Sequence, residues 1–144
     1  MTFYFIQGEK MVTDNTSIIR ARDVMRKGIV SIDGMATAKK AAAKMRSEKV
    51  FCLLVKKRHV DDAWGIVVVQ DFIKGVIIAG RSPDAVHVYE IMTKPVITVP
   101  AVMDIRYVAR LIYRAGIRRA PVEDGGELIG MISLSSLILD NELF

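Results

Sequence analysis

The stretch Asp23–Ile32, with sequence DVMRKGIVSI, recurs with conservative changes as Glu90–Val99, with sequence EIMTKPVITV. The offset of 67 residues (from 23 to 90) persists through the apolar positions that follow. These positions are Ala38, Ala41, Ala42 and Met45, matched by Ile105, Val108, Ala109 and Ile112. A later pair, Gly65-Ile66-Val67 and Gly130-Met131-Ile132, is offset by 65 residues (from 65 to 130). Such a repeat predicts two copies of one supersecondary unit around a pseudo-twofold axis.

The size of the chain predicts one compact assembly. It has 144 residues, of which 51% are hydrophobic. Each copy has only about 55–60 residues, which is marginal for an independent core. We therefore expect the two copies to share their core.

The composition excludes several classes of function. The net charge of +5 is spread along the chain, so nucleic acid is not expected as the main partner, and a nucleic-acid-binding accessory is a third, weaker interpretation that only the net charge supports. No apolar run is long enough to span a bilayer, so no membrane association is expected. The single cysteine, Cys52, favours a cytoplasmic protein. His59 and His87 have no second ligand at metal spacing and no paired nucleophile, so we expect neither a metal site nor an enzyme.

The repeat divides the chain into an N-terminal extension (1–18), a first domain (19–80), a linker (81–87) and a second domain (88–144). Both copies predict the order β-α-β-β-α, a mixed α/β (α+β) fold. Thr37 and Asp104 are the expected N-caps of the first helices. The remaining elements are expected as extended segments at 28–32 and 95–99, strands at 50–55, 65–69, 117–122 and 128–134, a polar turn at 123–127, and closing helices at 71–79 and 135–141.

Three stretches together identify a family resemblance: the repeated opening, the segment Gly116–Val122 (GIRRAPV), and the segment Gly130–Ser136 (GMISLSS). The chain resembles the cystathionine-β-synthase (CBS) domain family over roughly residues 19–142, in the tandem pair called a Bateman module. The resemblance implies a ligand containing adenosine, such as AMP, ADP or ATP, or else S-adenosylmethionine or NAD. It places this ligand in the cleft between the two domains and implies no required cofactor.

The family pattern G-h-x-h-h-P, followed by G-h-h-[S/T]-x-x-[D/N], implies the ligand-binding residues. In the second copy the arginines stand where phosphate is bound, Ser133 holds the hydroxyl position, and Ser136 replaces the carboxylate. In the first copy Asp71 keeps the carboxylate, but Val68 replaces the hydroxyl. The expected ligand-binding residues are Thr98, Arg118, Arg119, Ala120, Pro121, Ser133, Ser136 and Asp71.

The same residues have structural explanations. Asp71 and the serines could instead be caps of the closing helices. Arg118 and Arg119 are adjacent on an expected strand and would point to opposite faces, so at most one faces a given cleft. Thr98 could simply favour a strand.

These observations predict a regulatory or sensor module that binds an adenine nucleotide and transmits its occupancy to an unidentified effector protein. The alternative is a protein–protein scaffold or dimerisation module with vestigial clefts. The apolar stripes and closing helices also predict a homodimer, because two short copies cannot readily cover them.

Overall fold

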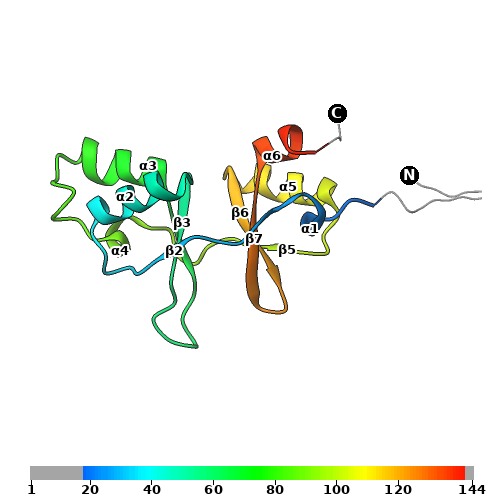
Figure 1. Ribbon diagram of the computed structural model, residues 1–144, viewed down its shortest axis with the longest axis horizontal. Helices are drawn as coiled ribbons and strands as arrows, with labels where there is room; N and C mark the ends of the chain where they lie inside the picture. The colour runs from blue at the N-terminus through cyan, green and yellow to red at the C-terminus, as the bar shows by residue number, and fades with distance from the viewer. Residues whose placement is uncertain (1–17, 142–144) are drawn as a thin grey trace, which may run out of the picture. The chain divides into compact units, whose positions relative to one another are not determined.

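The computed structural model describes residues 18–141, so the predicted extension lies, apart from Ile18, outside the described residues. The described chain forms two compact units (Figure 1). The first, here called the terminal unit, consists of residues 18–28 and 98–141, and the central unit consists of residues 29–97. Within residues 18–141, no helix is long and apolar enough to cross a membrane.

The terminal unit is a four-stranded sheet with the order β1-β7-β6-β5. Its strands are β1 (Arg26–Lys27), β5 (Val99–Pro100), β6 (Arg119–Asp124) and β7 (Glu127–Ser133). Only β5 and β6 are parallel; the other pairs are antiparallel. Its helices are α1 (Ala21–Val24), α5 (Ile105–Ala115) and α6 (Leu134–Leu139).

The central unit repeats this design with a three-stranded sheet of order β2-β3-β4. Its strands are β2 (Ser31–Ile32), β3 (Cys52–Val55) and β4 (Gly65–Val68). Its helices are α2 (Ala38–Glu48), α3 (Val69–Phe72), the π-helix η1 (Ile73–Ile78) and α4 (Val88–Ile91). The mixed fold and its two repeats are as predicted.

Each unit contains a short helix from the other sequence repeat. The opening of the first repeat, α1, lies in the terminal unit, where Ala21 N–H donates to the Met103 carbonyl at 2.9 Å. The opening of the second repeat, α4, lies in the central unit, where Val88 N–H donates to the Ala36 carbonyl at 2.9 Å. Each unit therefore has its own core, completed by a helix from the other repeat, in place of the one core shared by both copies that the sequence predicted. The predicted domain limits, 19–80 and 88–144, describe the sequence repeat and stay a prediction.

The repeated carboxylate of the opening motif caps its helix. Asp23 accepts a hydrogen bond from the backbone N–H of Arg20 at 2.9 Å, and Glu90 accepts one from that of His87 at 2.8 Å. In each case the carboxylate of the third helical residue accepts a hydrogen bond from the backbone N–H of the N-cap residue. This interaction is one of the two hydrogen bonds of a capping box. The opening motif was predicted as an element only from residue 28 onward, so these four-residue helices are additions to the expected order.

The remaining elements follow the prediction with shifted ends. Thr37 caps α2 and Asp104 caps α5, as expected. The polar turn is shorter than predicted, because Gly125 and Gly126 have positive φ and close a two-residue hairpin turn. The predicted helix 71–79 begins as α3 and continues as η1, where Gly75 allows a close approach to Ile91 of α4.

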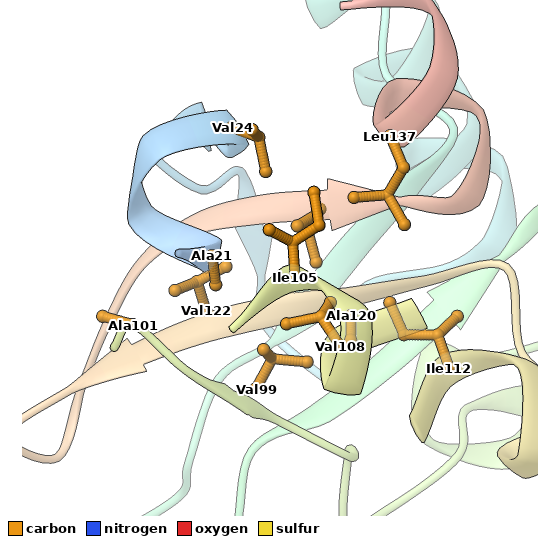
Figure 2. Packing of buried hydrophobic residues seen from close by; sticks show 11 residues of the cluster. Ala21, Val24, Val99, Ala101, Ile105, Val108, Ile112, Ala120, Val122 and Leu137 are labelled. Carbon is orange, nitrogen blue, oxygen red and sulfur yellow. The ribbon is translucent and has the colours of Figure 1, made fainter. Parts of the chain in front are cut away.

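Each unit has its own hydrophobic core. In the terminal unit, side chains of α1, α5 and α6 meet those of the sheet, as Figure 2 shows. The apolar stripes expected to form a dimer surface are mostly inside these cores. Ala38, Ala41 and Met45 are buried in the central unit, and Ile105, Val108 and Ile112 are buried in the terminal unit. Ala42 and Ala109 are only partly buried, so most, but not all, of each stripe is covered within its own unit.

The methionine of each opening motif packs against a glycine of the sheet in the same unit: Met25 against Gly130 and Met92 against Gly65. A Cβ added at Gly130 would lie 2.6 Å from the Arg26 carbonyl oxygen and 2.7 Å from Met25 Sδ. A Cβ at Gly65 would lie 3.0 Å from Met92 Sδ and 3.2 Å from the Thr93 carbonyl oxygen. In both units the exchanged segment therefore contacts this glycine directly.

We predict that Gly130→Ala destabilises the protein more than Gly65→Ala does. At Gly130 the new methyl group meets backbone, which cannot rotate away, whereas at Gly65 the closest atom belongs to a flexible methionine. Overpacking of this kind costs about 1–3 kcal/mol, and Gly130→Ala should lie at the upper end. Urea unfolding measures both variants, and equal midpoints would contradict the contact assigned to Gly130.

A second prediction concerns Asp71, which accepts a hydrogen bond from the Val68 backbone N–H at 2.8 Å at the start of α3. Burial raises the pKa of the Asp71 carboxyl above 3.8, although this hydrogen bond and Lys74 act in the opposite direction. Folded Asp71 then binds a proton more tightly than unfolded Asp71. The stability of the wild type relative to Asp71→Asn should rise as pH falls from 7 toward 4.

Glu90→Gln is the matched control, because Glu90 has the same capping role but a lowered pKa. The hydrogen bond from the His87 backbone is the largest cause of the lowered pKa of Glu90, followed by the hydrogen bond from the Arg81 side chain. The stabilising contribution of the Glu90 carboxylate is present above the pKa of Glu90 in the unfolded chain and is lost as pH falls. The wild-type advantage over Glu90→Gln should therefore shrink over the same pH series. Parallel trends for the two variants in urea unfolding would refute the assignment.

Candidate functional site

The candidate site lies on one face of the terminal sheet. Side chains alternate along β6, and Ala120 and Val122 lie in the core beneath the helices. Arg119 and Pro121 therefore face away from the helices. Ser133 of β7 pairs with Arg119 in the register of these antiparallel strands, which places the two side chains on this same face.

Two serines cap the N-terminus of α6, and one of them, Ser133, is the cross-strand partner of Arg119. Ser133 Oγ accepts a hydrogen bond from Ser136 N–H at 3.1 Å, and Ser136 Oγ accepts one from Ser133 N–H at 3.0 Å. Ser136 Oγ also donates to the Ser133 carbonyl at 2.8 Å. The capping role that the sequence left open is therefore real for both residues. A hydroxyl oxygen can take part in more than one hydrogen bond, so the cap does not preclude ligand contact.

Thr98 immediately precedes β5, and its side chain already makes a hydrogen bond within the protein. Its hydroxyl donates to Glu123 Oε1 at 3.2 Å. The pairing of Val99 with Val122 puts Thr98 on the same face as Pro121 and Glu123. Thr98 thus lies on the face that carries Arg119 and Ser133. Glu123 was assigned to a turn in the sequence analysis, and its place on this face followed only from the strand register.

The other predicted residues of this copy have different surroundings. Arg118 precedes β6 and is exposed, while its carbonyl accepts a hydrogen bond from Leu134 N–H at 2.9 Å. The side chain of Ala120 is fully buried in the core, so any ligand contact would have to use its backbone. Pro121 is also buried. The register therefore brings together Thr98, Arg119, Pro121 and Ser133, and it separates the side chain of Ala120 from them.

The equivalent face of the central unit is apolar. Cys52 pairs with Val68 where Arg119 pairs with Ser133, and Leu54 pairs with Ile66. All these positions lack a charge, and three of the four side chains are buried, Val68 being partly exposed. Asp71 is a polar residue next to this face, and its carboxylate caps α3. The two repeats thus share a backbone design but present faces of opposite chemical character.

The face of the terminal unit can hold an anionic, partly apolar ligand. Arg119 supplies a guanidinium for phosphate, Ser133 and Thr98 supply hydroxyl groups, and the partly exposed Met131, which pairs with Pro121, supplies an apolar contact. Among residues 18–141 no group of His, Cys, Asp or Glu side chains could hold a metal ion.

The chain is similar to known proteins over most of its length. The CBS domain model matches residues 21–77 and 88–139. An uncharacterized protein of Methanopyrus kandleri is 32% identical over 117 residues, which cover 81% of this chain and 59% of that protein. This chain thus spans less than two thirds of the length of that relative.

Two solved structures have a similar fold. A hexameric CBS-CP12 protein from bloom-forming cyanobacteria is 38% identical, with a TM-score of 0.81 and coverage of 85% of this chain and 70% of that one. A conserved CBS domain protein of unknown function from Thermoplasma acidophilum is 26% identical, with a TM-score of 0.75 and coverage of 83% and 67%. The chain therefore belongs to the CBS domain family, with two CBS domains in tandem.

Proposed function

We propose that this protein is a regulatory module that binds an adenine nucleotide at the face of the terminal unit. The observation that carries the proposal is the cross-strand pair of Arg119 and Ser133 on the face of the sheet away from the helices. In this assignment Arg119 binds phosphate through charge-assisted hydrogen bonds, and Ser133 binds a ribose hydroxyl. Met131, which is partly exposed, contacts the adenine.

The contrast between the two repeats supports placing the ligand in the terminal unit. The central unit has Cys52 and Val68 at the positions of Arg119 and Ser133, so it lacks both the cation and the hydroxyl. A phosphate on that face would lose its hydration without a charged partner, which is costly. The roles of Asp71 and Ser136 toward ribose, and a ligand position between the two domains, remain part of the proposal. So do the cytoplasmic location and an effector protein that responds to the bound nucleotide.

We predict that ATP binds with a dissociation constant in the micromolar to sub-millimolar range, corresponding to about −5 to −8 kcal/mol. Arg119→Gln should weaken ATP binding by about 1.5–3 kcal/mol, the scale of a hydrogen bond to a charged group. The same change should weaken adenosine binding much less, because adenosine has no phosphate. Isothermal titration calorimetry with ATP, AMP and adenosine measures all three affinities.

Arg118→Gln is the matched control, because it removes the same charge from the neighbouring residue, which lies before the strand. It should change ATP affinity by much less than Arg119→Gln does. Equal losses in the two variants would show that Arg119 acts only through its positive charge and would contradict its direct contact with phosphate. No heat from AMP, ADP, ATP, NAD or S-adenosylmethionine at millimolar concentration would refute nucleotide binding altogether.

A second candidate function, protein–protein association, is favoured by an apolar groove on the helical side of the central unit. The groove has a volume of about 460 Å³ and is lined mainly by Met45, Val50, Phe51, Val69, Phe72 and Ile73. The neighbouring side chains of Ile77 and Ile78 are 68% and 75% exposed. Contiguous apolar surface of this kind is typical of an interface. We propose a second copy of this chain as the partner, in line with the hexameric state of the cyanobacterial relative.

We predict that Ile77→Glu shifts the protein toward the monomer. The change places a charge on the exposed surface beside the groove, which a dimer would have to bury without a partner. Multi-angle light scattering at micromolar concentration should give about twice 16.0 kDa for the wild type and a smaller mass for the variant. Val60→Glu is the control, because Val60 is 84% exposed in the loop between β3 and β4. A monomeric wild type, or equal effects of the two changes, would refute this interface.

A further inference from the structure

The outer face of α5 carries three arginines and two tyrosines. At about 100° per residue, these five positions fall within an arc of about 120°. They lie opposite Ile105, Val108 and Ile112, which are buried in the core of the terminal unit. The five residues, here called the α5 stripe, are exposed and consist of Arg106, Tyr107, Arg110, Tyr113 and Arg114.

Two arginines of the α5 stripe contact one of its tyrosines. The guanidinium carbons of Arg106 and Arg110 lie 5.9 and 5.5 Å from the centre of the Tyr107 ring. Such cation–π contacts hold the guanidinium groups against the helix surface. Tyr113 is 78% exposed, so its ring is available to a partner. The stripe therefore offers three cations, two of them in contact with the Tyr107 ring, and the open aromatic face of Tyr113.

This arrangement is unfavourable for the helix alone. Arg106, Arg110 and Arg114 follow one another at intervals of four residues, where like charges repel. The helix contains no acidic residue. Asp104, at the N-cap, pairs with Arg106 at 2.8 Å, which lowers the pKa of Asp104. Within residues 18–141, no carboxylate pairs with Arg110 or Arg114. An anionic partner would relieve this repulsion.

The equivalent helix shows that the fold does not require such a stripe. At the offset of 67 residues, the five positions in α2 are Lys39, Lys40, Ala43, Arg46 and Ser47. They include no aromatic residue, and Lys39 pairs with Asp84 at 3.7 Å. Two helices in the same structural role thus differ in their outer face. The arginines and tyrosines of α5 are a property of the second repeat.

We propose that the α5 stripe binds single-stranded nucleic acid. The arginines would bind phosphates, for which the planar guanidinium is well suited, and Tyr113 would stack on a base. An acidic protein or an anionic membrane would satisfy the charges but would not need an exposed aromatic ring beside them. Although the charge is spread along the sequence, the helix gathers it on one face. The stripe faces away from the sheet, so this inference does not depend on the proposed nucleotide site.

The test is fluorescence anisotropy with a labelled 20-nucleotide oligouridylate between 50 and 200 mM NaCl. We expect a dissociation constant of about 10⁻⁴–10⁻⁶ M. If three phosphates are neutralised, the logarithm of the association constant should fall with the logarithm of the salt concentration. The slope should be about −2, since each phosphate contributes about −0.7 for a single strand. Arg110→Gln/Arg114→Gln should weaken binding at least tenfold and make the slope shallower by about 1.4. Tyr113→Gln should weaken binding about tenfold without changing the slope.

Lys39→Gln/Lys40→Gln is the matched control, because it removes two charges from the equivalent face of α2. It should change the affinity by no more than about twofold. Three outcomes would overturn the proposal: no binding at 50 mM salt, equal losses in the α2 and α5 double variants, or full binding by Tyr113→Gln. Equally tight binding to polyglutamate or to phosphatidylserine vesicles would assign the stripe to a different anionic partner and would also overturn it. Circular dichroism should show unchanged folding, since every changed side chain is exposed.

Discussion

The structure depends on the docking of one short helix from each repeat onto the unit formed mainly by the other repeat. Backbone hydrogen bonds fix this docking at equivalent places, from Ala21 to Met103 and from Val88 to Ala36. The methionine after each helix then packs against Gly130 or Gly65. Without the exchanged helices, each core would lose buried side chains such as Ala21 and Val24 in one unit and Val88 in the other. The strands that carry the candidate site are therefore held by residues remote in sequence.

Much of this fold could be predicted from the sequence because local signals and the repeat agree. Thr37 and Asp104 are caps, and the apolar stripes of α2 and α5 are core residues. The exchange could not be predicted, because two nearly identical openings fit either unit equally well by pattern alone. The stripes were assigned to a dimer surface because two short copies seemed too small to cover them, whereas most of these residues are buried within their own units. The cap formed by Asp23 was also missed, because a four-residue helix has too few positions to show a period.

For the candidate site, residue types were easier to predict than directions. Arg118 and Arg119 looked equivalent in the sequence, and the register of β6 with β7 is what places Arg119 opposite Ser133. The buried side chain of Ala120 is explained by the same alternation. Glu123 was missed because the two-residue turn at Gly125-Gly126 extends the strand beyond the predicted end. Strand register is a non-local property, so a motif match alone cannot give it.

The two repeats show how one backbone design can support different chemistry. The sheet face of the central unit is apolar, whereas that of the terminal unit has a cation and hydroxyl groups. The helices differ too, since α5 has aromatic and arginine side chains where α2 has lysines and small residues. The differing helix positions are exposed, so substitution there costs little stability, whereas the sheet face of the central unit consists mostly of buried side chains. The second repeat therefore has a cation and hydroxyl groups on the face where the first repeat has apolar side chains.

The segment exchange also bears on how such a chain could arise. Because the docked helix of each unit comes from the other repeat, two separate molecules of a single repeat could make the same contacts by trading their first helices. That arrangement is a swapped homodimer, in which each molecule completes its neighbour. Joining two such molecules through residues 81–87 turns an encounter that depends on concentration into an intramolecular one. After that fusion, each half is free to change its surface without having to match an identical twin.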